Sequence, residues 1–213
     1  MQEHSHIVDN RSDTVRLHHR VSSPTAGVTT NDRTVIATGD SSYRRLTSVN
    51  ATVLLIDHQI GPLWELEFAE TRRAIVALAR FADEMRLPTV ISAIGLETWG
   101  AVIPELTDAY PTAPHIVRAS VNPWDDARVR TSIERSRREK LVIAGGAGAP
   151  SVTLCALSAA RAGYEVYCAL DASAQLGHDA IARLAREGVI ATTTSLITTE
   201  ILSERSTRRR AWR

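Results

Sequence analysis

The chain has 213 residues, 44% of them hydrophobic, and a formal net charge of +1. This length and apolar content can fill one well-packed core but argue against two domains. A charge so close to zero gives no general electrostatic reason to expect a nucleic-acid partner. No apolar run reaches the 18 residues typical of a membrane span. We therefore expect one globular domain that binds neither nucleic acid nor membrane.

The two ends differ from the middle of the chain. Residues 1–48 lack sustained periodicity and are rich in small polar residues and His, so we expect a flexible N-terminal extension before a domain at residues 49–204. Residues 205–213 form a basic tail, which we interpret as a solvated end and not as a polyanion site. Cys155 and Cys168 are the only cysteines, and both lie in apolar surroundings. Together with the lack of a secretory leader, they favour a reduced, cytoplasmic protein.

Apolar and amphipathic segments alternate regularly from residue 51 onward. In chain order, we expect a strand at 51–56, a helix at 67–85, strands at 88–94 and 115–118, a helix at 125–137, a strand at 140–144, a helix at 151–162, a strand at 164–170, a helix at 178–187, a strand at 189–194 and a helix at 196–202. Strands that alternate with helices favour parallel pairing with right-handed crossovers. The sequence therefore predicts an α/β fold, a three-layer αβα sandwich around a six-stranded parallel sheet.

A long connection, residues 95–114, is expected to be a loop between the second and third strands. Loops of this length in compact domains are often functional. Glu97 and Trp99 on this loop could line a pocket, although a local packing anchor is an equally good interpretation.

Three polar residues follow apolar strand residues at the expected carboxyl edge of the sheet: Asp57, Arg118 and Ser151. Ligands of such sheets bind outside the carboxyl ends of the strands, where the strand order reverses. Ser151 follows a glycine-rich turn and opens a helix, whose free N–H groups would favour an anion or a developing oxyanion. A plain packing turn would look the same. The glycines miss the Gly-x-Gly-x-x-Gly spacing of dinucleotide sites, so no cofactor is expected.

Five segments stand in a characteristic order: VLLIDHQ at 53–59, PTVI at 88–91, VIPEL at 102–106, NPWD at 122–125 and LDAS at 170–173. Together they resemble the isochorismatase-like cysteine hydrolases, in particular the YcaC-like branch. The resemblance covers roughly residues 50–203. It implies an αβα sandwich that forms homo-oligomers and hydrolyses C–N bonds of small amides through an Asp, a Lys and a Cys. The Asp-x-His-x-His pattern of the zinc-containing members is absent between Ile94 and Ala101, so no metal is expected.

The resemblance assigns roles to individual residues. Asp57 matches the general base. Arg118 stands where most members have lysine; a guanidinium can orient Asp57 but cannot donate a proton as lysine could. Ser151 occupies the position of the nucleophilic cysteine. The oxyanion hole would be formed by the N–H groups of Ala147 and Ser151, after a cis peptide bond that ends at Ala147. Cys155, one helical turn beyond Ser151, we interpret as a small buried apolar residue.

Four further residues are candidates for substrate contact. Gln59 and Trp124 lie in the matched segments, Trp99 lies in the long loop, and His178 matches a histidine of the branch at the start of a helix. His58 directly follows Asp57 and should point away from it, so we expect a structural role.

Serine in place of cysteine leaves the function open. A hydroxyl stays protonated and needs a base in the transition state, whereas a cysteine can become a thiolate. In one hypothesis Ser151 attacks a small amide, ester or related substrate with Asp57 as base. In a second, Asp57 is a general acid/base without a covalent intermediate, as in the family's cleavage of vinyl ethers such as isochorismate. In a third, the protein has lost catalysis and acts in binding or assembly. A Cys-to-Ser change introduced by design would leave the same sequence.

Overall fold

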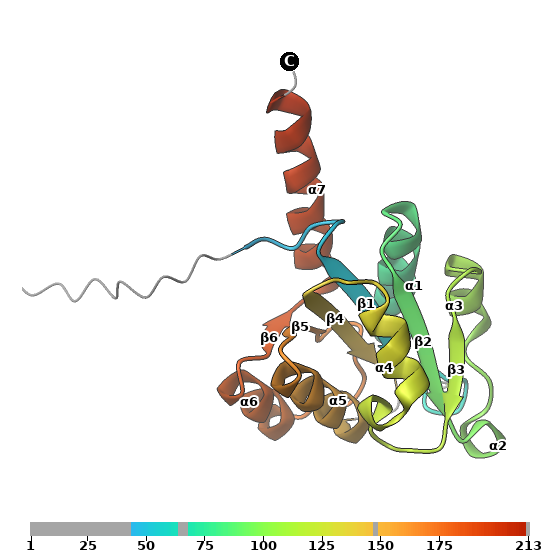
Figure 1. Cartoon of the computed structure of the whole chain (residues 1–213). Helices are drawn as coiled ribbons and strands as arrows, with labels where there is room; N and C mark the ends of the chain where they lie inside the picture. Colours follow the sequence, from blue (N-terminus) through green and yellow to red (C-terminus); the bar gives the residue numbers. More distant parts are fainter. Residues whose placement is uncertain (1–43, 64–67, 147–148, 212–213) are drawn as a thin grey trace, which may run out of the picture. The chain divides into compact units, whose positions relative to one another are not determined.

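The computed structural model describes residues 44–63, 68–146 and 149–211. Its centre is a six-stranded sheet in the order β3-β2-β1-β4-β5-β6, with all neighbouring strands parallel (Figure 1). The strands are β1 (Ala51–Ile56), β2 (Thr89–Ile94), β3 (His115–Arg118), β4 (Lys140–Gly145), β5 (Glu165–Ala169) and β6 (Ile190–Thr192). The predicted α/β class and six-stranded parallel sheet are confirmed.

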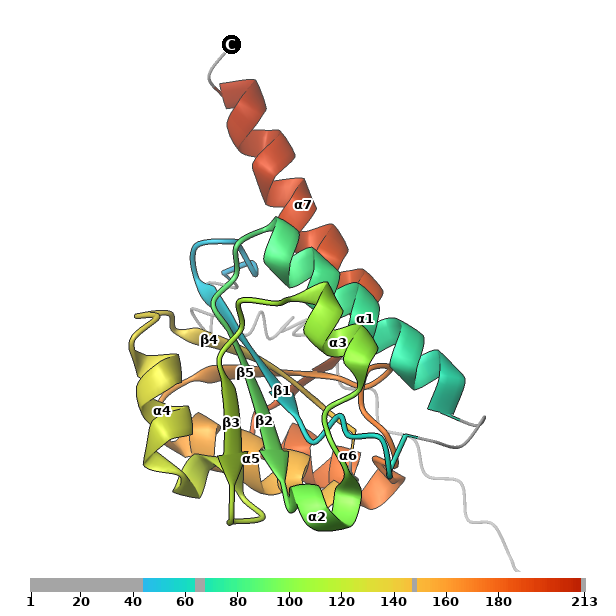
Figure 2. The same cartoon turned by 90° about the vertical axis from the view of Figure 1, so that its right-hand side faces the viewer.

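Helices cover both faces of this sheet (Figure 2). One layer contains α1 (Ala69–Glu84), α3 (Pro104–Ala109) and α7 (Thr194–Ala211). The opposite layer contains α4 (Ala127–Glu134), α5 (Ala149–Arg161) and α6 (His178–Arg186). The short helices α2 (Leu96–Trp99) and η2 (Pro123–Asp125) lie in connections near the carboxyl ends of the strands. The molecule is therefore the three-layer sandwich expected from the alternation of segments.

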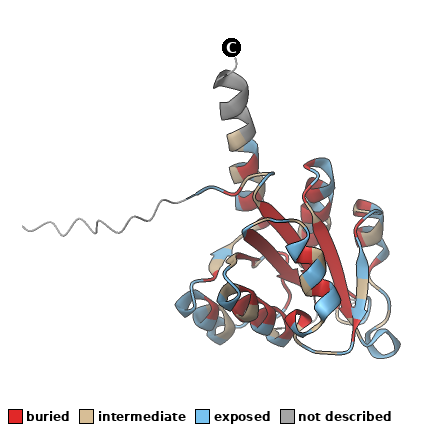
Figure 3. Ribbon diagram, viewed as in Figure 1, coloured by how far each residue is buried: buried red, intermediate tan, exposed pale blue. Residues whose placement is uncertain are grey.

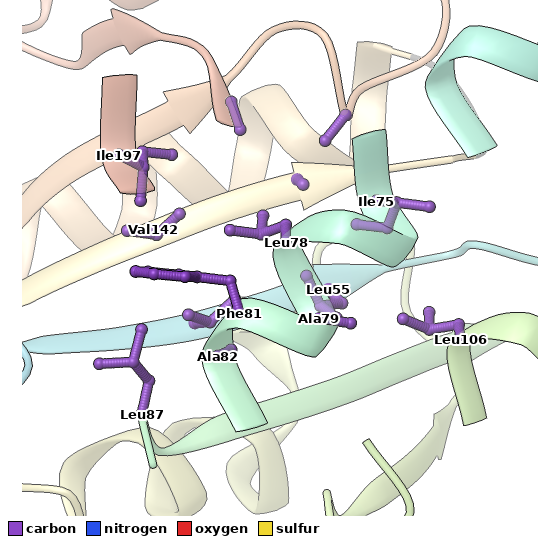
Figure 4. Packing of buried hydrophobic residues seen from close by; sticks show 14 of the residues in the cluster. Leu55, Ile75, Leu78, Ala79, Phe81, Ala82, Leu87, Leu106, Val142 and Ile197 are labelled. Atoms are coloured by element: carbon purple, nitrogen blue, oxygen red, sulfur yellow. The ribbon is translucent and has the colours of Figure 1, made fainter. Parts of the chain in front are cut away.

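Each layer of helices encloses its own apolar core. Successive strand residues point to opposite faces, so Val53 and Leu55 of β1 join the core under α1, whereas Leu54 and Ile56 join the core under α5. Figure 4 shows the first core, in which Leu78 and Phe81 of α1 lie over the sheet. All six residues of β1 and all six of β4 are buried, as the red strands of Figure 3 show. Burial on both faces explains why these strands are continuous apolar runs.

Some boundaries differ from the predicted ones. The expected loop 95–114 contains α2 and α3, which are too short to produce a helical pattern in the sequence. The expected helix 125–137 begins later, because Asp126 caps α4 by accepting a hydrogen bond from the N–H of Arg128 at 2.8 Å. The last helix, α7, continues to Ala211 into the predicted basic tail. Among the described helices, none combines the length and apolarity needed to cross a membrane.

Residues 44–48, the last part of the predicted N-terminal extension, pack at the amino ends of the strands. Lys140 is fully buried there; its ammonium donates to Glu165 Oε1 at 2.9 Å, to the hydroxyl of Tyr167 at 3.0 Å and to the carbonyl of Arg44. The N–H of Leu46 donates to Glu200 Oε1 of α7 at 2.6 Å. Lys140 thus lies at the opposite end of the sheet from Asp57 and serves to hold this segment.

Candidate active site

The strand order reverses between β1 and β4. The chain passes from β1 outward to β2 and β3, and then returns to place β4 on the other side of β1. At such a point the connections leave in opposite directions and open a crevice. Asp57 follows β1, while the turn after β4 leads into α5 and Ser151. The topology therefore places both residues at the edge where a ligand is expected.

The backbone at this point is tightly fitted. Asp57 has a left-handed conformation with φ of +54°, a region that Asp adopts more readily than most residues. Its N–H donates to the carbonyl of Ser92 at 2.8 Å. Gly146 passes so close that a Cβ there would lie 2.7 Å from the Asp57 carbonyl oxygen and 2.8 Å from the Cα of His58. Only glycine allows β4 to turn against the residue that ends β1.

Arg118 holds the Asp57 carboxylate with two parallel hydrogen bonds. Nη1 donates to Oδ1 at 2.8 Å, and Nη2 donates to Oδ2 at 2.6 Å. Both side chains are fully buried. Nη2 also donates to the carbonyl of Val121 at 3.2 Å. This planar arrangement fixes the carboxylate in orientation, which a lysine could not do with a single charged nitrogen.

Burial and charge act in opposite directions on this pair. Burial raises the pKa of Asp57, and the Arg118 charge, the Ser151 hydroxyl and the Ile94 N–H each pull that pKa back down. For Arg118, burial lowers the pKa and the Asp57 charge opposes that shift. A carboxylate whose pKa is raised accepts a proton more readily than an exposed aspartate. This property suits a general base.

Ser151 lies close to this carboxylate. It is in the first turn of α5 with 6% of its surface exposed, and its hydroxyl is near enough to Asp57 to lower the pKa of the carboxyl. The N–H groups of a first helical turn have no acceptor within the helix and carry partial positive charge. Ser151 therefore lies beside a carboxylate that can accept its proton and in the first turn of a helix.

Cys155 lies one turn further along α5 and is fully buried in the second core. Burial raises the pKa of its thiol well above the ordinary value, although the Arg118 charge opposes the shift. A neutral buried thiol is a poor nucleophile. The geometry supports the interpretation of Cys155 as a small apolar residue.

Only part of the expected oxyanion hole lies within the described residues. Ala147, and the cis peptide bond expected to end at it, lie outside the described residues. The peptide bonds of the described ranges are all trans. Ser151 itself lies in the first turn of α5, where its N–H can point at a bound oxygen.

Gln59 and Trp124, two of the residues expected to contact substrate, are engaged within the protein. The Gln59 amide donates to the carbonyls of Ile94 and Gly100 at 3.0 and 2.7 Å and accepts from the N–H of Ile94 at 3.2 Å. Trp124 is buried in the second core, edge-on to Tyr164 with ring centroids 5.5 Å apart. Gln59 thus ties the end of β2 and α2 to the end of β1, and Trp124 packs beneath α5.

The other two candidates for substrate contact, Trp99 in α2 and His178 at the start of α6, are exposed. His58 is fully buried, with Nε2 3.2 Å from the carbonyl of Ala172, and burial lowers its pKa to about 4. Because a carbonyl only accepts, Nε2 carries the proton and the ring is neutral at pH 7. This buried, neutral ring agrees with the structural role that the sequence predicts for His58.

Sequence reasoning missed two backbone groups of the site. The N–H of Ile94 lowers the pKa of Asp57, and the carbonyl of Val121 accepts from Arg118. Every residue carries these groups, so no side-chain signal marks them. Among the described residues, no cluster of three or more His, Cys, Asp or Glu is placed to hold a metal ion.

A hollow of about 370 Å³ lies beside the start of α5, between α5 and α6. Pro150, next to Ser151, and Leu154 line one wall, and Ala180 and Arg183 of α6 line the other. The hollow therefore begins one residue from the candidate nucleophile and offers apolar surface, the Arg183 guanidinium and the Asp179 carboxylate.

Comparison with known proteins finds relatives of this chain. The model of the isochorismatase domain matches residues 51–200. The chain is 33% identical over 156 residues to "Probable hydrolase YcaC" of Escherichia coli strain K12, an alignment that covers 68% of this chain and 74% of that protein. Both β1 and the carboxyl-edge residues described above lie within the matched range.

Solved structures show the same relationship. The crystal structure of the E. coli YcaC gene product, described as an octameric hydrolase of unknown specificity, matches with a TM-score of 0.71 and 30% identity over 76% of this chain and 83% of that chain. YcaC from Pseudomonas aeruginosa, solved with hexane-2,5-diol and covalent acrylamide, also gives a TM-score of 0.71, at 29% identity over 76% of this chain and 85% of that chain. With the family model spanning most of the folded region, the chain belongs to the isochorismatase-like hydrolase family and is similar to its YcaC branch.

Proposed function

We propose that this protein hydrolyses a small amide or ester, with Ser151 as nucleophile and Asp57 as general base. The observation that carries the proposal is the position of the Ser151 hydroxyl beside a buried carboxylate, whose pKa the hydroxyl lowers and which Arg118 holds with two hydrogen bonds. An aspartate is ordinarily a weak base for an alcohol. Here burial raises its pKa, which favours transfer of the serine proton.

The reaction would proceed in two halves. Ser151 Oγ attacks the carbonyl carbon while its proton passes to Asp57, and N–H groups at the start of α5 stabilise the oxyanion. Asp57 then gives the proton to the leaving nitrogen or oxygen as its bond to carbon breaks, which leaves an acyl-serine. Water attacks the acyl group, gives one proton to Asp57, and the acid leaves as Ser151 regains the proton. Arg118 keeps Asp57 oriented throughout and transfers no proton.

A second candidate function uses Asp57 without a covalent intermediate. The raised pKa of Asp57 makes its protonated form more accessible, and a protonated carboxyl can donate to the carbon of a vinyl ether. Ser151 would then only contact the substrate. The two candidates differ in whether an acyl group is ever attached to the protein.

We also propose that the protein works as a homo-oligomer. The relative from E. coli, which matches this chain at a TM-score of 0.71, is described as octameric.

The test is a comparison of wild type, Ser151→Ala and Asp57→Asn on small amides, activated esters and isochorismate. Mass spectrometry of the protein during turnover detects any acyl adduct. We expect wild-type turnover that both substitutions reduce by at least about 100-fold, and an adduct on Ser151. Turnover that needs Asp57 but survives Ser151→Ala would support the second candidate. No wild-type turnover on any substrate would point to a protein that binds or assembles without catalysis.

A further inference from the structure

Exposed apolar side chains gather at one edge of the molecule. The described residues include nine large hydrophobic side chains that are exposed, and five of them lie around the carboxyl end of β3. We call this set the α2–β3 patch: Ile60, Leu96, Trp99, Val117 and Val121, which are 36%, 40%, 46%, 47% and 50% exposed. In Figure 3, α2 and much of β3 carry the pale blue of exposed residues. A concentration of this kind on a soluble domain marks an interaction surface.

Contacts join the segment after β1, α2 and β3, and Val121 lies three residues after the end of β3. The N–H of Ile60 donates to the carbonyl of Ala101, and the N–H of Gly61 donates to the carbonyl of Trp99, both at 2.9 Å, which joins the segment after β1 to α2. Leu96 and Val117 line one shallow hollow of about 220 Å³. Val117 also pairs with Ala93 in the sheet.

The patch is continuous with the candidate active site. Val121 accepts a hydrogen bond from Arg118, and Arg118 is the last residue of β3. Whatever covers the patch therefore lies beside the chain segment that positions Asp57.

The strand beneath the patch is also the edge of the sheet. β3 pairs with β2 alone and has only four residues. Arg128 of α4 donates to the Val117 carbonyl at 2.7 Å. Among the described residues, no other side chain forms a hydrogen bond with the backbone of this strand. Proteins rarely leave an apolar edge strand open to water, because it invites association. This edge is therefore better suited to an interface than to free solvent.

We infer that the α2–β3 patch is the surface through which a second copy of this chain docks. The inference rests on the homo-oligomer proposed above and assigns it a place on the molecule. Five half-exposed apolar side chains amount to a few hundred Å², whereas a stable interface buries roughly 800 Å² on each partner. The patch thus fits the apolar centre of an interface that has a polar rim.

The rim suits a copy of the same chain. Glu97 is an exposed carboxylate in the middle of α2, and the exposed Arg128 guanidinium beside Val117 is paired with Asp126 at 2.6 Å. A two-fold arrangement brings the same patch of both copies together, so that these polar and charged groups surround the apolar centre on both sides.

The first test compares the mass in solution of full-length wild type, Val121→Glu and Leu196→Glu. Leu196 is 60% exposed on α7 and lies outside the patch, so Leu196→Glu is the matched control. We expect wild type and the control to share one oligomeric mass by light scattering, and Val121→Glu to fall to half that mass or less with an unchanged circular dichroism spectrum. An oligomer that Val121→Glu leaves intact would overturn the placement.

A second measurement does not depend on how well the charged variant folds. In Val121→Cys the new thiol is exposed, whereas Cys155 and Cys168 are buried. We expect a short bismaleimide to link two copies through residue 121. Absence of cross-linking in an oligomeric protein would place the interface elsewhere, and a monomeric wild type would overturn both the interface and the homo-oligomer. Each of these results is independent of whether Asp57-dependent hydrolysis is found. If wild type is a monomer and removal of residues 1–43 increases maleimide access to residue 121, the patch is covered by the chain's own N-terminal segment. That result would also overturn the inference.

Discussion

Arg118 and Asp57 form two hydrogen bonds of 2.8 and 2.6 Å although 61 residues separate them in the chain and neither side chain reaches solvent. A buried pair of this kind costs desolvation energy that only good geometry offsets. The place of this pair at the carboxyl edge of the sheet is consistent with a role in orienting the Asp57 carboxylate and not only in stability.

Removing the cation should therefore be costly. We expect Arg118→Met to lower the free energy of unfolding by about 3–5 kcal/mol, because it leaves the Asp57 carboxyl buried without its partner. Arg118→Lys should cost less, since it keeps a charge but loses the second parallel bond. Urea denaturation measures both. As a control, Arg128→Met removes an ion pair with Asp126 at an exposed guanidinium and should lower the free energy of unfolding far less than Arg118→Met. Equal losses at positions 118 and 128 would contradict the importance of burial.

Gly146→Ala should disturb the site through the backbone. The new Cβ would approach the Asp57 carbonyl and the His58 Cα to 2.7 and 2.8 Å, distances that force β1 and β4 apart. We expect a loss of roughly 1–3 kcal/mol in thermal or urea unfolding, accompanied by a loss of any Asp57-dependent activity. Gly177→Ala is the matched control, because nothing lies within 4 Å of its Cβ position. The control should lose under about 1 kcal/mol, from a weaker helix N-cap alone.

His58 should make stability depend on pH. Burial lowers its pKa to about 4 in the folded protein, from 6.5 for an ordinary histidine. Because the folded pKa is the lower one, the unfolded chain binds a proton at a higher pH than the folded protein does. The contribution of His58 to the stability of the fold is therefore complete above pH 6.5 and is lost as the pH falls toward 4. Linkage predicts about 2 kcal/mol less stability at pH 5 than at pH 8 from this residue. His58→Gln, which can still donate to the Ala172 carbonyl, should show a pH dependence smaller by that amount. Identical pH dependence in both proteins would contradict a neutral buried ring.

Ser151→Cys should create a reactive thiol. A cysteine there would lie in the first turn of α5 beside Asp57 and its Arg118 partner, an environment in which the helix end and the guanidinium favour a thiolate. We expect Ser151→Cys to form a covalent adduct with acrylamide, detected by intact-protein mass spectrometry, and wild type to form none. Wild type serves as the control for Cys155 and Cys168, since burial raises the pKa of both thiols. Modification of Cys155 in the folded wild type would show that it is accessible and reopen its assignment.

The sequence predicts the fold well because the strands at the centre of the sheet are buried on both faces. All residues of β1 and β4 are buried, and the one charged residue among them, Lys140, is paired with Glu165. The same patterns identify Asp57, the first polar residue after β1, and Arg118, the polar residue that ends β3. Strand order then follows from parallel pairing and brings the two together.

The contacts of individual side chains could not be predicted in the same way. Gln59 lies in a segment that resembles the family, but its amide is used by the backbone of residues 94 and 100, a fact that depends on how the following connection folds. Trp124 likewise turns inward, because η2 packs against α5. The helices α2 and α3 are too short to carry a hydrophobic period. Where the candidate site includes backbone groups, as at Ile94 and Val121, side-chain chemistry gives no signal.

Lys140, the single lysine of the chain, is fully buried at the amino end of the sheet. Reagents that acylate amines therefore find, in the folded protein, the α-amino group and no accessible lysine side chain. Once the strands separate, the Lys140 ammonium becomes available to the same reagents. The extent of acylation at this one residue thus reports the fraction of molecules that have opened, so the protein contains a chemical probe of its own unfolding that needs no engineered label.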